Sequence, residues 1–172
     1  MKNAAAAACL FAGLTAFSIG ARADEEKIAL KDVPKAVLDA VKARFPKAEI
    51  KAAEKEVEDG KTSFEIALED DEHNIDVALN ADGKILEIEK EVAAKDLPKT
   101  VLDAVAAKHP NGKIKKAEEI LAFENGKEEK SFEVIVETAG GKSVEAKLTP
   151  DGKVVKQDDD DDKAEKNEKD DD

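Results

Sequence analysis

The chain contains an internal repeat, which limits the folds that it can adopt. The stretch KDVPKAVLDAV that begins at Lys31 returns as KDLPKTVLDAV at Lys95. Aligned without a gap, residues 30–54 and 94–118 share 15 identical pairs out of 25. Shorter matches follow, SFEI against SFEV and DGKI against DGKV. A duplication of this kind indicates two copies of one small supersecondary unit that stack on each other.

Each copy begins with the signature of a short helix. Asp32 and Asp96 suit the N-cap position, and Pro34 and Pro98 fit the first helical turn. Valines and leucines then recur at helical spacing, which gives each helix one apolar face. The next proline of each copy ends the helix, because the residue before proline avoids the helical region. Helices of about three turns are not stable alone, so each must pack on another element.

The rest of each copy alternates apolar and polar residues with a period of two, which predicts strands that have one face on a core and one in water. Asp-Gly and Asn-Gly pairs between these runs favour tight turns. The predicted strands cover residues 50–57, 64–68, 75–79 and 86–89, then 114–123, 132–136, 144–148 and 154–155. The predicted fold class is α+β, with two tandem repeats, each one short helix packed on an antiparallel sheet of about four strands.

The N-terminal segment, residues 1–23, predicts a secretory signal peptide. One early lysine precedes an apolar run over residues 4–19, and Ala21-Arg22-Ala23 fits the small-residue cleavage pattern, with cleavage after Ala23. The apolar run is shorter than the roughly 20 residues of a spanning helix. We therefore expect a periplasmic or secreted protein with no membrane span after signal removal. The single cysteine, Cys9, lies in the removed segment, so no disulfide is expected.

The remaining chain divides into three predicted parts. Repeat 1 covers residues 24–92, repeat 2 covers 93–156, and an acidic tail covers 157–172. The tail consists almost entirely of charged residues and holds no apolar residue larger than alanine, so we expect it to be disordered. Its aspartates are candidates for weak binding of divalent cations: Asp158, Asp159, Asp160, Asp161 and Asp162.

The charge of the chain excludes some partners. The full sequence carries a net charge of −13, and loss of Lys2 and Arg22 with the signal peptide makes it more negative. Nucleic acids and anionic membranes are bound by basic surfaces, so neither is an expected partner. A solvated exported protein, or one that meets a cationic partner, remains compatible with this charge.

The sequence predicts no enzyme and no cofactor. Beyond the signal peptide the only serines are Ser63, Ser131 and Ser143, and the two histidines stand at non-equivalent places in the repeats. A catalytic triad needs a nucleophile, a base and an orienting group within hydrogen-bond reach, and no set of residues here nominates one. His109 takes the place of Phe45, which indicates a packing role at the end of a helix.

Two stretches resemble metal sites, but neither predicts a specific one. His73 follows Asp70, Asp71 and Glu72, and one imidazole among mobile carboxylates is an unselective site. The segment from Asn80 to Glu89 has the spacing of part of an EF-hand loop. The first ligand position would be Ala78 and the flanks are strand-like, so we expect a hairpin turn there.

The motifs together resemble the PepSY-like family of small exported, β-lactamase-inhibitor-like domains. The resemblance spans nearly the whole chain after the signal peptide except the tail, in two tandem copies. Related PepSY domains occur in protease propeptides and periplasmic proteins, which implies a binding or inhibitory module. The residues that carry the match are Pro34, Val37, Ala40, Val41, Phe45, Pro46, Ile50, Phe64, Glu65, Asp82, Gly83 and Lys84, and then Pro98, Val101, Ala104, Val105, Pro110, Ile114, Phe132, Glu133, Asp151, Gly152 and Lys153.

Two functions follow as hypotheses. The first is an exported, non-catalytic binding module that presents a two-repeat sheet surface to an exported protein or peptide, with inhibition of an enzyme as one form of it. The alternative is an acidic envelope protein that binds divalent cations weakly through its tail or acts as a solubilising or structural protein.

Overall fold

The structure is a computed structural model that describes residues 24–58, 60–71 and 73–159. The described chain is α+β: two α-helices and one antiparallel sheet whose strand order follows the chain order. The helices are α1 (Lys35–Arg44) and α2 (Lys99–Lys108). The strands are β1 (Asp24–Lys27), β2 (Glu49–Glu58), β3 (Lys61–Asp70), β4 (His73–Asn80), β5 (Ile85–Glu91), β6 (Lys113–Glu124), β7 (Lys127–Glu137), β8 (Ser143–Leu148) and β9 (Val154–Asp159).

Both helices start later than the sequence predicts. Asp32 and Asp96 are not N-caps; they lie in the short 3-10 turns η1 (Leu30–Asp32) and η2 (Ala94–Asp96). The residue after each turn is extended, with a ψ of 134° at Val33, because the ring of the following proline excludes the helical region. Each proline is therefore the N-cap, and the helices end before the next proline, as predicted.

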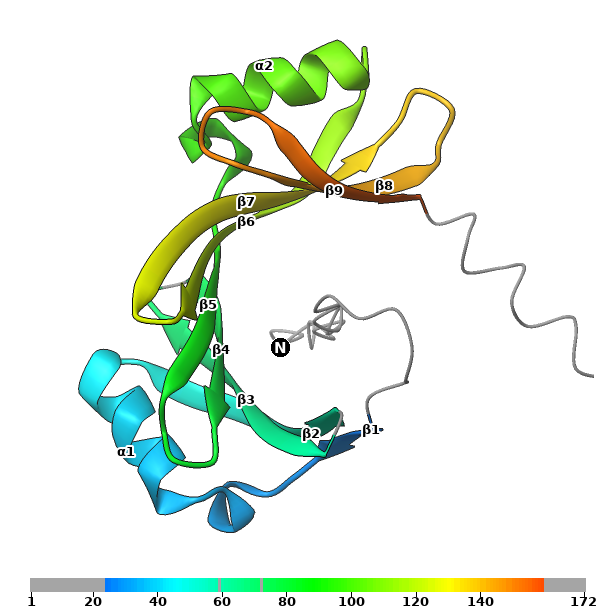
Figure 1. Ribbon diagram of the computed structural model, residues 1–172. Coiled ribbons are helices and arrows are strands. Elements are labelled where there is room, and N and C mark those ends of the chain that lie inside the picture. Colours follow the sequence, from blue (N-terminus) through cyan, green and yellow to red (C-terminus); the bar gives the residue numbers. More distant parts are fainter. Residues whose placement is uncertain (1–23, 59, 72, 160–172) are drawn as a thin grey trace, which may run out of the picture.

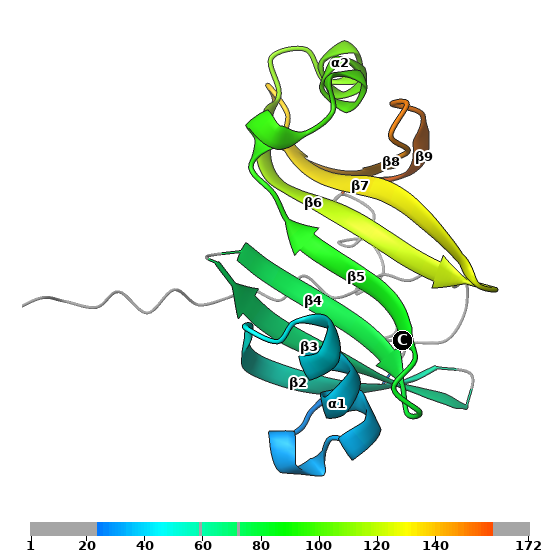
Figure 2. The ribbon, with the colours of Figure 1, turned by 90° about the vertical axis from the view of Figure 1, so that its left-hand side faces the viewer.

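Each helix packs on its own half of the sheet. Val37 and Val41 of α1 are buried against the centres of β3 and β4, and Val101 and Val105 of α2 are buried against β7 and β8. Burial of these valines supplies the apolar contact that such short helices need. Figure 1 shows both helices on the outer, convex side of the arc that the sheet forms, and Figure 2 shows that side from the front.

The strands of the two repeats form one sheet, where the sequence predicts a sheet for each repeat. β5 pairs with β6 over five register pairs, from Glu87 opposite Ala122 to Glu91 opposite Glu118. Leu121 and Phe123 of the second repeat pack against the core of the first. Strand β1, which has only four residues, is not among the predicted strands. The α+β class is confirmed, and the eight predicted strands are present.

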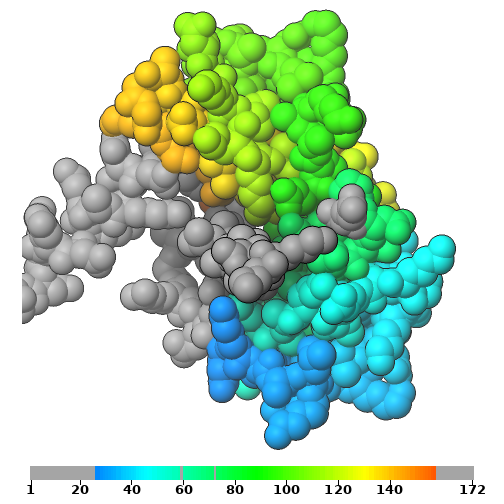
Figure 3. Space-filling model, turned by 180° about the vertical axis from the view of Figure 1, so that it is seen from behind, coloured from blue at the N-terminus to red at the C-terminus, as the bar shows by residue number. Residues whose placement is uncertain are grey.

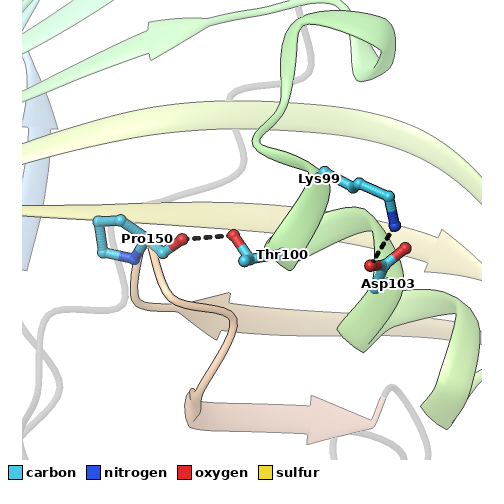
Figure 4. A network of polar contacts seen from close by, with 4 residues as sticks. All are labelled: Lys99, Thr100, Asp103 and Pro150. Carbon is cyan, nitrogen blue, oxygen red and sulfur yellow. Dashed lines mark hydrogen bonds and ion pairs between the residues drawn. The ribbon is translucent and has the colours of Figure 1, made fainter.

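The Asp-Gly-Lys motif of each repeat docks a hairpin turn on the first turn of a helix. A Cβ built on Gly83 would lie 2.5 Å from the carbonyl oxygen of Ala36, and one on Gly152 would lie 2.5 Å from that of Thr100. Both glycines have positive φ angles, +82° and +85°. In the second repeat, the Thr100 hydroxyl also donates to the Pro150 carbonyl oxygen at 2.6 Å (Figure 4). Each of these two positions therefore requires glycine for two reasons: the positive φ angle and the close approach of the helix backbone.

The acidic tail begins later than predicted. Gln157, Asp158 and Asp159 belong to β9, which pairs with β8, so the assignment of the tail to residues 157–172 is wrong for its first three residues. Backbone hydrogen bonding to β8 outweighs the low strand propensity of aspartate here. The rest of the predicted tail, residues 160–172, and the predicted signal peptide lie outside the described residues.

Candidate functional site

The concave face of the sheet is the candidate functional site. Strand residues alternate between the helix-covered face and this one, and paired residues share a face. No described helix covers it (Figure 1). Carboxylates gather at its centre, and we call this set the carboxylate face: Glu54, Glu65, Asp76, Glu87, Glu89, Glu91, Glu118, Glu133 and Glu145. Lysines are interspersed among them, with Lys116, Lys147 and Lys156 on the second repeat.

Each repeat contributes one carboxylate pair at the same place. Glu54 stands opposite Glu65 in the β2–β3 ladder, and Glu118 stands opposite Glu133 in the β6–β7 ladder. Like charges directly opposite each other on a sheet are destabilising. The second pair is the more enclosed, since Glu118 is only 6% exposed. The duplicated unit therefore carries a like-charge pair in both copies, and a lysine lies beside each: Lys27 at 3.8 Å from Glu54 and Lys116 at 2.8 Å from Glu118.

The junction between the repeats holds further buried carboxylates. Asp76 of β4 stands opposite Glu89 of β5, which in turn stands opposite the buried Ile120 of β6. Burial raises the pKa of Asp76 to about 6, and the Glu118 carboxylate contributes to this rise. Burial also raises the pKa of Glu89 to about 9, with the neighbouring Glu87 as the next cause. These groups hold protons at pH values where free carboxylates have lost them.

Glu133 behaves in the same way on the second repeat. Burial raises its pKa to about 7, and the Glu145 carboxylate across the β7–β8 ladder adds to the effect, while Lys147 and Lys116 oppose it. The face therefore lacks enough positive charge to ionise all of its carboxylates near neutral pH. Cations brought by a partner would favour the ionised forms.

Lysines on the carboxylate face already form ion pairs with its glutamates. Lys116 Nζ lies 2.8 Å from Oε1 of Glu118. Burial lowers the pKa of Lys116, but the hydrogen bond and charge of Glu118 outweigh it, so the pKa is raised. Lys147 Nζ of β8 lies 3.8 Å from Oε2 of Glu87 on β5. A side chain that reaches across two intervening strands shows how strongly the sheet curves inward.

The structure separates the predicted site residues. Asp158 and Asp159 are in β9, in register with Glu145 and Val144, while Ala23 and Asp160–Asp162 lie outside the described residues. The two described tail aspartates are therefore part of the sheet edge. Cation binding by the segment beyond Asp159 stays a prediction.

The two stretches that resemble metal sites are strand ends and turns. Asp70 ends β3 and His73 begins β4, and the two are paired in the ladder. The Asn80 side-chain oxygen accepts hydrogen bonds from the backbone N–H groups of Asp82 and Lys84, at 3.1 and 2.9 Å, and so stabilises the expected hairpin turn. Within the described ranges, no group of three or more His, Cys, Asp or Glu side chains is placed to hold a metal ion.

The carboxylate face is not conspicuous in the sequence. All of its residues except Glu91 are polar positions of predicted strands in a chain in which 40% of residues are charged, so no single carboxylate stands out. A signal was present in the repeat itself: Glu54 and Glu118 align, as do the glutamates of the two SFE motifs, Glu65 and Glu133. Their partnership needs the strand register, which the sequence does not supply.

These features define a class of protein: a small α+β protein with a curved sheet, helices on its convex side and a carboxylate-lined concave face. A comparison with protein families gives the particular family. Residues 21–87 and 73–156 match the family described as "Putative beta-lactamase-inhibitor-like, PepSY-like". The chain belongs to this family, as its motifs predict, and the two matched segments agree with two tandem copies. The segments overlap over residues 73–87, in β4 and the start of β5.

Solved structures share the fold at low sequence identity. A "putative periplasmic" protein from Bacteroides eggerthii is 18% identical with a TM-score of 0.62, over 74% of this chain and 88% of its own. A DUF2874 family protein from Bacteroides uniformis is 16% identical with a TM-score of 0.62, over 74% and 89%. A BLIP-like protein from Bacteroides fragilis is 24% identical with a TM-score of 0.58, over 73% and 86%.

No curated protein matches the sequence significantly. Among the helices that the structure describes, none combines the length and the apolar character needed to cross a membrane.

Proposed function

We propose that this protein is an exported, non-catalytic binding module that docks a protein or peptide on the concave face of its sheet. The observation that carries the proposal is the carboxylate face, in which acidic residues from β2 to β8 outnumber the lysines. Charge complementarity makes the contacting segment of the partner cationic. Periplasmic location is part of the proposal, supported by the N-terminal pattern of residues 1–23 and by the description of a structural neighbour as periplasmic.

The energetics favour a cationic ligand over a neutral one. The protein holds Asp76, Glu89 and Glu133 partly buried among like charges, which raises their pKa values. A lysine or arginine placed between them would relieve the repulsion and favour the ionised carboxylates. The same field would speed the encounter with a positively charged partner at low ionic strength.

Inhibition of an enzyme is a narrower form of the proposal. It is motivated by the family description and by the BLIP-like neighbour. Rate assays of a β-lactamase and of a protease with micromolar protein would show a loss of activity if inhibition is the function. Unchanged rates for both would remove this form and leave the binding proposal standing.

The binding proposal is tested with a defined probe. A decapeptide of alternating lysine and serine is titrated against the protein by calorimetry, beside a matched glutamate–serine peptide. We expect binding of the lysine peptide only, with an affinity that falls as salt is raised. The test variant carries four glutamine substitutions in the two repeated pairs: Glu54→Gln, Glu65→Gln, Glu118→Gln and Glu133→Gln.

The matched control removes the same charge from the convex side. It carries asparagine at four exposed, repeat-equivalent positions in the helices and the turns before them: Asp32→Asn, Asp39→Asn, Asp96→Asn and Asp103→Asn. The proposal expects the glutamine variant to lose at least ~10-fold in affinity, about 1.4 kcal/mol, and the control to lose less than half of that free energy. Equal losses would assign the binding to net charge and overturn the proposed face.

Export is tested separately by mass spectrometry of the protein recovered from the periplasm of an expressing bacterium. Cleavage after Ala23 predicts a chain that begins at Asp24. Recovery of the full-length chain in the cytoplasm alone would contradict the exported part of the proposal.

A further inference from the structure

The sheet ends in two edge strands that lie at the two ends of the arc, β1 and β9 (Figure 1). The space-filling view from behind shows the start of the described chain, in blue, at the lower end and the region of β7 and β8, in yellow to orange, at the upper end (Figure 3). Edge strands expose unpaired backbone groups that invite pairing with another chain. The internal duplication shows which strand would pair with each of these edges.

β9 lies on β8 as β5 lies on β4. Val77 stands opposite Ile88, and the equivalent Ala146 stands opposite Gln157. Both ladders then shift register at the same point, just before Leu79 pairs with Ile85 and before Leu148 pairs with Val154. Position by position, β9 is therefore the copy of β5, and its outer edge corresponds to the edge of β5 that binds β6.

β1 occupies the complementary edge. Lys27 stands opposite Glu54, and at the equivalent place of the second repeat Glu91 stands opposite Glu118 in the same register. β1 thus covers β2 as β5 covers β6, but over four residues only. By register, β9 of one molecule matches β2 of a second, so the junction between the repeats could be reproduced between molecules and the sheet could continue.

The residues of β9 differ from those of β5 at the positions that contact β6 in the junction between the repeats. Inside the molecule, Ile88 is 5% exposed and pairs with Leu121, and Glu89 pairs with Ile120, which is 1% exposed. In the equivalent register between two molecules, Gln157 would face Val57, and Asp158 would face Glu56. An amide replaces an apolar side chain in the first pair, and two acidic residues meet in the second, which is unfavourable. The next residue, Asp159, would face Lys55, so the unfavourable contacts are confined to Gln157 and Asp158.

We propose that β1, together with Gln157 and Asp158 of β9, guards the two sheet edges against a second copy of this chain. The intramolecular junction shows that the edges fit, and the altered residues remove the interactions that hold the junction together. Charged residues on an edge strand and very short edge strands are both ways in which proteins prevent edge-to-edge association. The guard lies at the sheet edges and does not depend on the proposed binding function of the concave face.

The test replaces residues of β9 so that the strand resembles β5 more closely. The edge variant carries Gln157→Ile and Asp158→Asn, and a second variant adds Glu26→Pro to break the pairing of β1 with β2. Sedimentation velocity over a concentration series measures association. We expect the wild type to stay monomeric, the edge variant to associate at least ~10-fold more tightly, and the second variant to associate more tightly still. Hydrogen exchange is expected to slow at residues 156–159 and 55–58 in the associated form.

The control removes negative charge without touching β9: Asp170→Asn, Asp171→Asn and Asp172→Asn. It is expected to stay monomeric. If the edge variant does not fold by circular dichroism, the milder single substitution Asp158→Asn replaces it in the same series. A wild type that associates with protection at both edges would overturn the proposal. So would folded variants that remain monomeric at the highest concentration, or a control that associates as strongly as the edge variant.

Discussion

The two repeats agree in how the helix meets the sheet and differ in what the sheet presents. A Cβ added to Gly83 or to Gly152 would lie the same 2.5 Å from a helix carbonyl oxygen, and Val37 and Val101 are both fully buried. By contrast, Phe45 is replaced by His109, and Ile88 of β5 by Gln157 of β9. The residues that both copies share are those that pack each helix on the sheet. The replaced strand residue lies at the junction with the other repeat in the first copy and on an edge strand in the second.

The largest expected effect tests whether the docked turn is equally required in both repeats. Gly83→Ala and Gly152→Ala should each lower the free energy of unfolding by about 3 kcal/mol, because each combines a positive φ with a backbone clash. Chemical denaturation measures both. Gly126→Ala is the control: its φ is also positive, at +75°, but no atom lies within 4 Å of the added Cβ, so about 1 kcal/mol is expected. Equal losses at all three sites would contradict a docking role.

The next effect concerns the carboxylates at the junction between the repeats. The pKa values of Asp76, Glu133 and Glu89 are raised to about 6, 7 and 9, so the folded state binds more protons than the unfolded state between about pH 4 and pH 9. The free energy of unfolding should therefore be highest near pH 4 to 5 and fall as pH rises. Glu89→Gln should raise it at pH 8 by about 2 kcal/mol after allowance for solvent screening.

Urea denaturation at several pH values checks this dependence, with Glu128→Gln, an exposed substitution of equal charge, as the control. Binding of the lysine peptide should have the opposite pH dependence, weakening as pH falls because protonated carboxylates attract cations less. Stability that rises with pH over the same range would contradict the assigned burial.

The substitution of Phe45 by His109 predicts a smaller effect. Nε2 of His109 is buried and has no hydrogen-bond partner among the described residues. His109→Phe should therefore raise the free energy of unfolding by about 1 kcal/mol, because it removes an unsatisfied polar atom. Thermal unfolding compares it with the reverse change, Phe45→His, which should destabilise the first repeat. If His109→Phe destabilises the protein, the imidazole has a role that packing does not explain.

The smallest effect is expected at the helix surfaces. Lys35 pairs with Asp39, and Lys99 pairs with Asp103 (Figure 4), in exposed i, i+4 arrangements. Asp39→Asn and Asp103→Asn should each cost about 0.3 kcal/mol, and the cost should vanish at about 1 M salt. A loss above about 1 kcal/mol in either repeat would show that the pair also positions the helix.

The sequence is sufficient for the presence of the two helices and of β2 to β9, because their causes are local, but not for β1 or for the helix starts. Pro34 and Pro46 bracket α1, and alternation marks β3 and β4. It did not predict one continuous sheet, because the pairing of β5 with β6 is a contact between units that alternation does not encode. The carboxylate face was missed for the same reason: Glu54 and Glu65 lie on different strands and meet only through strand register.

In the proposed function the concave face, and not the net charge of the chain, binds a cationic segment. The most direct measurement is residue-resolved NMR of the backbone amides during titration with the lysine–serine decapeptide at physiological salt. The structure predicts shifts concentrated at the carboxylate face, in particular at Glu65, Asp76, Glu89 and Glu133, with little change in α1 and α2. Shifts spread evenly over exposed acidic residues on both sides of the sheet would contradict it.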